Sequence, residues 1–294
     1  MNYLVAALPN DPELAGWLGK KNGENGITFY NRRDGDNVYT ILAPSDLEGK
    51  FYAMGEVLTL ADVVIISTKS IDATFGEAVI AASLLKKRVF LTKDNDVSGV
   101  IGKLGLEHEL VDKEEILARL SAIASSKNSE GAPIIDIDKS FPVKGVGTVL
   151  LGIAASGTIK KHDELVTSHG KKLQVRSIQV QDEDRDSATP GARVGLAVKG
   201  VDDSDVEKGE IIAKERVGAV DEITAQLSFN PLDSSFSEDT QYTMVSGFGV
   251  VPCKISKDGS SYRIKFGKPM QMRNSFIILR DKKPKVLCAG RAVS

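Results

Sequence analysis

The first 124 residues alternate short apolar runs with stretches in which apolar residues recur at helical spacing. These patterns predict strands at 3–8, 38–43, 63–66, 89–91 and 108–111, and helices at 13–18, 51–60, 77–87 and 112–124. Asp112, followed by Glu114 and Glu115, is placed as the N-cap of the last helix. Because strands alternate with helices, we predict an α/β domain with a mostly parallel sheet covered on both faces.

The helical pattern ends at the small, polar run 125–132, which is typical of a linker. From Ile134 onward the chain contains short alternating segments separated by glycines such as Gly145 and Gly170, which is typical of a small β-barrel. A second all-β block begins at Ala219. The predicted fold class is therefore multi-domain, α/β plus all-β, with domains at residues 1–127, 133–216 and 217–294.

Composition narrows the classes of function. Among 294 residues, 38 Lys and Arg against 40 Asp and Glu give a net charge of −2, which argues against an indiscriminate binder of polyanions and of DNA. Cys253 and Cys288 form no metal-ligand pair, so we expect no metal site and no cofactor. No run approaches the ~20 apolar residues of a membrane span, and we expect a cytoplasmic protein with no membrane partner.

Several motifs in the middle of the chain carry a family resemblance. They are Phe-Pro-Val-Lys-Gly-Val-Gly-Thr-Val at 141–149, Val-Arg-Ser-Ile-Gln at 175–179 and Ala-Thr-Pro-Gly-Ala-Arg-Val-Gly-Leu-Ala at 188–197. In order and spacing they resemble the second domain of the translational GTPases, in particular the archaeal selenocysteine-specific elongation factor and, more distantly, elongation factor Tu. The resemblance implies a GTPase-like α/β domain followed by two barrels, the domain order predicted above.

The resemblance also implies a phosphate-binding loop, G-x-x-x-x-G-K-[ST], after the first strand. Aligned without gaps, residues 7–14 put Pro12, Glu13 and Leu14 where the family has its second glycine, lysine and hydroxyl residue. Proline removes an amide donor, and glutamate adds negative charge where a phosphate would lie. At ~4 Å and an effective dielectric constant of ~20, two like charges repel by roughly 4 kcal/mol. The loop is predicted not to bind GTP.

The family's second motif, D-x-P-G-H, holds magnesium and positions the attacking water. Met54 and Asp62 fix its register, which puts Ala43, Asp46 and Leu47 in place of the aspartate, the glycine and the histidine. A shifted register would keep Asp46 and Gly49 as D-x-x-G but would lose both anchors. In either register the histidine is absent, so no catalytic residue is predicted.

The third motif, N-K-x-D, recognises guanine after a strand. Here Thr92 and Lys93 follow the strand at 89–91, so the amide side chain and the spacing are both lost. Gly26-Ile27-Thr28 resembles the switch segment whose threonine binds magnesium, although a strand hydroxyl is an equal interpretation of Thr28.

In the family, the second domain holds the amino acid and terminal adenosine of a charged tRNA. Carried over by position, this pocket comprises Phe141, Val143, Val149, Gln179, Arg193 and Ala197. Val149 and Ala197 would form an apolar floor, and Arg193 would meet a phosphate or ribose. Asp182 falls where a basic residue would help. The alternative is that these positions serve only the fold of the barrel.

The resemblance and the three altered motifs lead to one leading hypothesis. The chain is predicted to be a non-enzymatic elongation factor-like protein that has lost GTP binding and hydrolysis. Its expected partners are tRNA or other translation-associated RNA, and translation or selenoprotein-related factors. Two alternatives stay open: a divergent GTPase that still binds nucleotide, and a protein–protein scaffold that reuses the fold.

Overall fold

The structure is a computed structural model that describes residues 1–9, 11–123 and 129–292. Asn10 of the expected phosphate loop, residue 124 of the last expected helix and residues 125–128 of the expected linker lie outside the described residues. The chain divides into two compact units, Met1–Asn2 with Ser125–Val220, and Tyr3–Ala124 with Asp221–Ser294. The second unit therefore combines the α/β domain with the last barrel.

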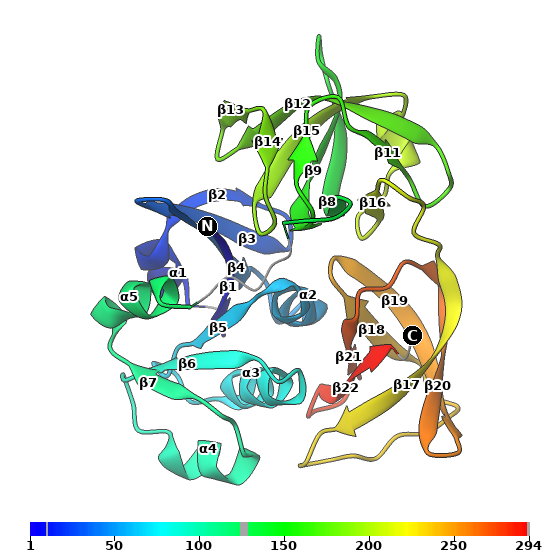
Figure 1. The fold of residues 1–294 in the computed structure, drawn as a ribbon. Coiled ribbons are helices and arrows are strands. Elements are labelled where there is room, and N and C mark those ends of the chain that lie inside the picture. The colour runs from blue at the N-terminus through cyan, green and yellow to red at the C-terminus, as the bar shows by residue number, and fades with distance from the viewer. Residues whose placement is uncertain (10, 124–128, 293–294) are drawn as a thin grey trace. The chain divides into compact units, whose positions relative to one another are not determined.

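The α/β domain is built on a seven-stranded sheet with the strand order β2-β3-β4-β1-β5-β6-β7 (Figure 1). Its strands are β1 (Asn2–Leu8), β2 (Lys20–Glu24), β3 (Ile27–Asp34), β4 (Asn37–Pro44), β5 (Val63–Ile66), β6 (Arg88–Thr92) and β7 (Glu109–Val111). The pairs β1–β5, β5–β6 and β6–β7 are parallel, whereas β2, β3 and β4 form an antiparallel meander. The expected mostly parallel sheet is thus a mixed sheet, because β2 and β3 are additional strands that sequence analysis missed.

Helices cover both faces of this sheet (Figure 1). They are α1 (Pro12–Leu18), α2 (Tyr52–Leu60), α3 (Ala73–Leu84), α4 (Ser98–Leu104) and α5 (Ile116–Ser121). Alternate residues of β1 separate the two faces: Val5 packs with Leu18 of α1 and Ile116 of α5 in one buried cluster. Leu4 and Leu8, which point to the other face, are also fully buried.

Two helix starts differ from expectation. α3 begins before residue 77, because the Asp72 carboxylate caps it by accepting a 2.9 Å hydrogen bond from the Phe75 amide. Asp112 does not cap a helix with its side chain: its carboxylate accepts a 2.5 Å hydrogen bond from Lys93 Nζ. A 3₁₀ turn at Lys113–Glu115 therefore precedes the short helix α5.

The middle barrel closes through strands β11, β16, β8, β9, β15 and β12, with β13 added beside β12. Their bounds are β8 (Ile134–Val143), β9 (Gly147–Ser156), β11 (Glu164–Val166), β12 (Lys172–Val180), β13 (Glu183–Arg185), β15 (Arg193–Lys199) and β16 (Ile211–Ala213), while β10 (Ile159–Lys160) pairs with β14 (Ser187–Ala188). Leu150, Ile178 and Leu196 belong to the core of the barrel. Gly152 allows β9 to approach β8, because an added Cβ would lie 2.4 Å from the Asp136 carbonyl oxygen.

The last barrel is closed in the order β17-β20-β19-β18-β21-β22. Its strands are β17 (Val220–Phe229), β18 (Tyr242–Ser246), β19 (Gly249–Asp258), β20 (Ser261–Met270), β21 (Ser275–Leu279) and β22 (Val286–Ala292). Cys253 and Cys288 are buried in its core as free thiols. The predicted fold class, an α/β domain followed by two β-barrels, is confirmed.

The α/β domain packs on this last barrel through α2 and α3. The carboxylate of Glu77 on α3, which is 7% exposed, accepts hydrogen bonds from the amides of Lys285 and Val286. Thr59 on α2 accepts a 3.1 Å hydrogen bond from the Gly247 amide. Within the described ranges, no helix is long and apolar enough to cross a membrane.

Candidate functional site

In the segment after β1, both carboxylate oxygens of Asp11 accept hydrogen bonds from groups of the protein. Oδ1 of Asp11 accepts a 3.0 Å hydrogen bond from the Leu14 amide, which caps α1, and Oδ2 accepts a 2.6 Å hydrogen bond from Ser67 Oγ. Pro12 occupies the first turn of α1 and has no amide hydrogen to donate. A helix N-terminus attracts anions through its unpaired amides, and here a side-chain carboxylate already occupies that position.

Glu13 lies in the first turn of α1 and forms an ion pair with Lys69, which follows β5. The hydrogen bond from Lys69 to Glu13 raises the pKa of the lysine. A lysine is therefore present beside Glu13, at the expected phosphate loop, but it comes from the segment after β5 and not from the segment after β1. Its charge is matched by a carboxylate of this chain.

The expected magnesium and water motif lies at the end of β4. Ala43 is buried and pairs with Thr28 of β3, so both residues are part of the antiparallel meander. Asp46 lies beyond the strand and accepts a 2.8 Å hydrogen bond from the Gly49 amide, which closes a turn. Leu47 is half-buried in that turn.

The expected guanine motif at the end of β6 is hydrogen-bonded to the end of β5. Thr68 donates two hydrogen bonds of 2.8 Å to Thr92. Its amide donates to Thr92 Oγ1, and its hydroxyl donates to the Thr92 carbonyl oxygen. Asn95 Nδ2 donates to the Thr68 carbonyl at 2.9 Å, and Lys93 is paired with Asp112. Open α/β sheets bind ligands at the carboxyl ends of their strands, and here these ends are linked to one another by protein groups.

The candidate tRNA pocket lies on the face of the middle barrel that is turned away from its core. Val149 of β9 pairs directly with Phe141 of β8 on one side and with Ala197 of β15 on the other. Direct cross-strand partners share a face, so the register brings these three apolar residues together. Val143 lies at the end of β8 opposite Gly147.

Arg193 and Gln179 carry the polar chemistry of this face, and both have acidic neighbours. Arg193 is largely buried and its guanidinium lies 3.9 Å from the buried carboxylate of Asp138. Burial lowers the pKa of Arg193, while the negative charges of Asp138 and Asp182 act in the opposite direction. Gln179 Nε2 donates a 3.0 Å hydrogen bond to Asp184.

The sequence did not reveal which residues contact the expected nucleotide motifs and the candidate tRNA pocket. Ser67, Thr68 and Lys69 directly follow the predicted strand at 63–66, so their position at the carboxyl end of a sheet strand was a usable signal. Asp138 gave no such signal, because a register shift in β8 between Ile137 and Lys139 sets its direction.

Comparison with known proteins gives a coherent set of relatives. The family model described as elongation factor Tu domain 2 matches residues 147–213. An uncharacterized protein of Methanocaldococcus jannaschii is 28% identical over 82% of each chain. The selenocysteine-specific elongation factor of Haemophilus influenzae is 34% identical over 34% of this chain, and elongation factor 1-alpha of Saccharolobus solfataricus is 27% identical over 53%. The chain spans only 16% and 38% of those two elongation factors.

Solved structures show the same fold along the whole chain. Translation elongation factor SelB of Methanococcus maripaludis, in complex with a GTP analogue, has a TM-score of 0.79 at 19% identity and covers 100% of this chain and 79% of its own. A bacterial selenocysteine-specific elongation factor has a TM-score of 0.81 at 19% identity, covering 99% of this chain and 58% of its own. The expected similarity to the selenocysteine-specific elongation factors is confirmed at the level of fold.

Proposed function

We propose that this relative of the translational GTPases is a non-enzymatic, cytoplasmic translation factor-like protein that neither binds nor hydrolyses GTP. One observation carries the proposal: the Asp11 carboxylate caps α1 and also accepts a hydrogen bond from Ser67. A triphosphate would have to displace this carboxylate, and it would then face the negative charge of Glu13.

Displacing the Asp11 carboxylate costs more free energy than this segment could regain through contacts with a phosphate. Pro12 has no amide hydrogen, so the first turn of α1 has one donor fewer than a phosphate loop. A buried donor or acceptor that loses its partner costs about 1–3 kcal/mol, and Ser67 is a buried residue whose hydroxyl would lose Asp11. Lys69 is exposed and could approach a phosphate only by leaving Glu13.

A calorimetric titration with GTP and with GDP, each in the presence of magnesium, tests the loss of nucleotide binding. We expect no heat of binding at micromolar nucleotide. A dissociation constant near a micromolar would overturn the proposal and favour the divergent GTPase instead.

We also propose that the outer face of the middle barrel binds the end of a tRNA or another translation-associated RNA. The half-buried side chains of Phe141 and Val149, beside the buried Ala197, support this role, because bases pack well on flat apolar and aromatic surfaces. Arg193 lies on β15 four residues before Ala197, and its guanidinium can add a charge-assisted hydrogen bond to phosphate.

Binding of fluorescent tRNA, aminoacylated or not, by the full chain tests the RNA part of the proposal separately from nucleotide. We expect saturable binding that does not change when GTP is added. Absence of binding to any tRNA would remove the RNA proposal and favour a scaffold for translation or selenoprotein-related proteins.

A further inference from the structure

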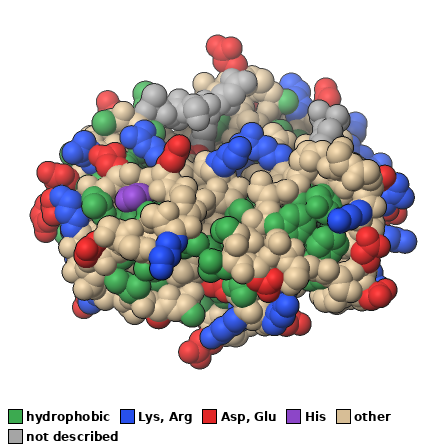
Figure 2. Space-filling view, turned by 90° about the horizontal axis from the view of Figure 1, so that it is seen from below, with side chains coloured by type: hydrophobic (Ala, Val, Ile, Leu, Met, Phe, Trp, Pro, Cys, Tyr) green, Lys and Arg blue, Asp and Glu red, His purple; other side chains and the backbone are tan. Residues whose placement is uncertain are grey.

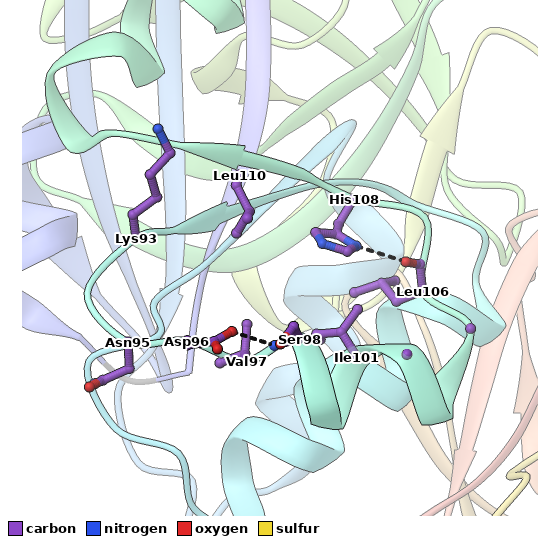
Figure 3. Close-up of a pocket in the computed structure, with 11 residues that line it drawn as sticks. Lys93, Asn95, Asp96, Val97, Ser98, Ile101, Leu106, His108 and Leu110 are labelled. Atoms are coloured by element: carbon purple, nitrogen blue, oxygen red, sulfur yellow. Dashed lines mark hydrogen bonds between the residues drawn. The ribbon is translucent and has the colours of Figure 1, made fainter.

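A pocket of about 500 Å³ lies in the α/β domain between α4 and β7, the strand at the edge of the sheet (Figure 3). Its walls include Ser98, Ile101 and Gly102 of α4 and Leu106, His108 and Leu110 from the segment that follows. None of the described residues of the segment 7–14, where the family's phosphate loop would lie, lines it. The pocket borders the expected guanine motif through Lys93 and Asn95, but its apolar walls come from α4 and from the segment 105–110.

The interior of the pocket is mainly apolar. Val97, Ile101 and Leu106 are nearly fully buried beneath it, whereas Leu110 on β7 keeps half of its surface exposed. Gly102 presents bare helix backbone: a Cβ built there would meet no atom within 4 Å. A pocket of this size and character lies within the range of about 300–1,000 Å³ that is usual for small-molecule sites.

His108 provides the polar group at the rim. Its Nδ1 lies 2.9 Å from the Leu106 carbonyl oxygen, which can only accept, so Nδ1 carries the proton and donates. In the neutral ring Nε2 is then an acceptor, and Figure 3 shows the second ring nitrogen on the side of Leu110.

The other polar groups of the rim are engaged elsewhere. Lys93 extends its ammonium group to Asp112, and the amide of Asn95 donates to the carbonyls of Thr68 and Lys69. The Asp96 carboxylate accepts from the Ser98 amide. Lys93, Asn95 and Asp96 lie at the exposed rim, whereas the interior is apolar, so the interior suits an uncharged ligand to which His108 Nε2 offers an acceptor.

From this geometry we infer that the pocket binds a small, uncharged, planar heteroaromatic ligand that donates one N–H hydrogen bond to His108 Nε2. The apolar residues of α4 and β7 contact the ring, and His108 Nε2 selects for the N–H group. None of the residues of the middle barrel takes part, so this inference does not depend on the proposed RNA binding.

Indole and benzothiophene form a matched pair of probes, since they share a bicyclic shape and only indole has an N–H group. In a titration of the isotope-labelled full chain followed by NMR, we expect indole to shift the signals of Ile101, His108 and Leu110. Benzothiophene should bind about fivefold more weakly, the effect of one neutral hydrogen bond.

Three variants locate the binding. Gly102→Leu has room at Cβ and should fill the pocket, which would weaken both probes at least tenfold. Gly99→Leu, on the same helix and equally free of neighbours at Cβ, does not line the pocket and should bind as the parent does. His108→Phe keeps a ring but removes the acceptor, so indole and benzothiophene should bind equally.

These titrations can support the inference or overturn it. Loss of indole binding in Gly102→Leu but not in Gly99→Leu supports the site, and equal probe affinities in His108→Phe support the hydrogen bond. No shift of these signals at millimolar indole overturns the inference, as does indole binding that Gly102→Leu leaves unchanged.

Discussion

At the scale of single residues, Arg193 is the side chain on which the RNA proposal depends most. It lies on β15, four residues before Ala197, and its largely buried guanidinium lies 3.9 Å from the buried carboxylate of Asp138. A positioned guanidinium can donate to a phosphate with little loss of side-chain entropy. Burial lowers the pKa of Arg193, and the negative charges of Asp138 and Asp182 oppose that shift.

We therefore predict that Arg193→Glu weakens tRNA binding far more than Lys86→Glu, which makes the same change of charge at an exposed residue in the turn after α3. The loss of a charge-assisted hydrogen bond is worth roughly 1.5–3 kcal/mol, whereas an exposed lysine contributes well under about 1 kcal/mol. Fluorescence titrations at two salt concentrations measure both. The effect of Lys86→Glu should fade as salt rises, and that of Arg193→Glu should persist.

Arg193→Gln serves as the control for folding, because Arg193→Glu places a second carboxylate beside Asp138. This variant removes the charge without adding a new one and should show most of the loss. If Arg193→Glu and Lys86→Glu weaken binding equally at both salt concentrations, the RNA contact is a diffuse electrostatic surface and not a pocket.

At the scale of secondary-structure elements, we predict that replacing a glycine by alanine changes stability in opposite directions in α2 and α3. A Cβ at Gly55 on α2 would lie 2.8 Å from Ile277 and 3.1 Å from Val245, both on the last barrel, so Gly55→Ala overpacks this contact. Gly76 on α3 has no such neighbour within 4 Å. In urea unfolding we expect Gly55→Ala to lose about 1–3 kcal/mol and Gly76→Ala to gain about 0.5–1 kcal/mol from helix propensity. A gain in both variants would mean that α2 does not pack tightly on the barrel.

Elements also show how far the sequence alone could lead. Strands such as β5 and β6 were predictable because short β-branched and apolar runs form buried parallel strands. β2 was missed because its residues are mostly exposed and polar, and α4 because Gly99 and Gly102 weaken its helical pattern.

The candidate sites were also predictable only in part from the sequence. Phe141, Val149 and Ala197 were selected by resemblance, and the register that makes them neighbours follows from strand pairing across the barrel. The contact of Glu13 with Lys69 and that of Arg193 with Asp138 join segments more than 50 residues apart. Such contacts depend on the three-dimensional packing of the strands, which local sequence patterns do not contain.

At the scale of the whole molecule, the α/β domain and the last barrel form one compact unit, and the middle barrel forms the other. Within the first of these, α2 and α3 join the two domains through buried contacts such as Glu77 with β22. A nucleotide can shift a conformational equilibrium only if it binds the two states differently. Under the proposed loss of GTP binding, no nucleotide is available to loosen this junction.

Glu77→Ala tests whether that junction makes the unit cooperative. The substitution leaves the Val286 amide, buried at 0% exposure, without its 2.9 Å acceptor, at a cost of about 1–3 kcal/mol. In hydrogen exchange followed by mass spectrometry, we expect β5, α3 and β22 to lose protection together by roughly 5–150-fold, the equivalent of that free energy, while β9 and β15 of the middle barrel keep theirs. Glu77→Gln retains one acceptor oxygen and should lose less. If the loss of protection is confined to β22, the α/β domain and the last barrel unfold independently, and the junction does not couple them.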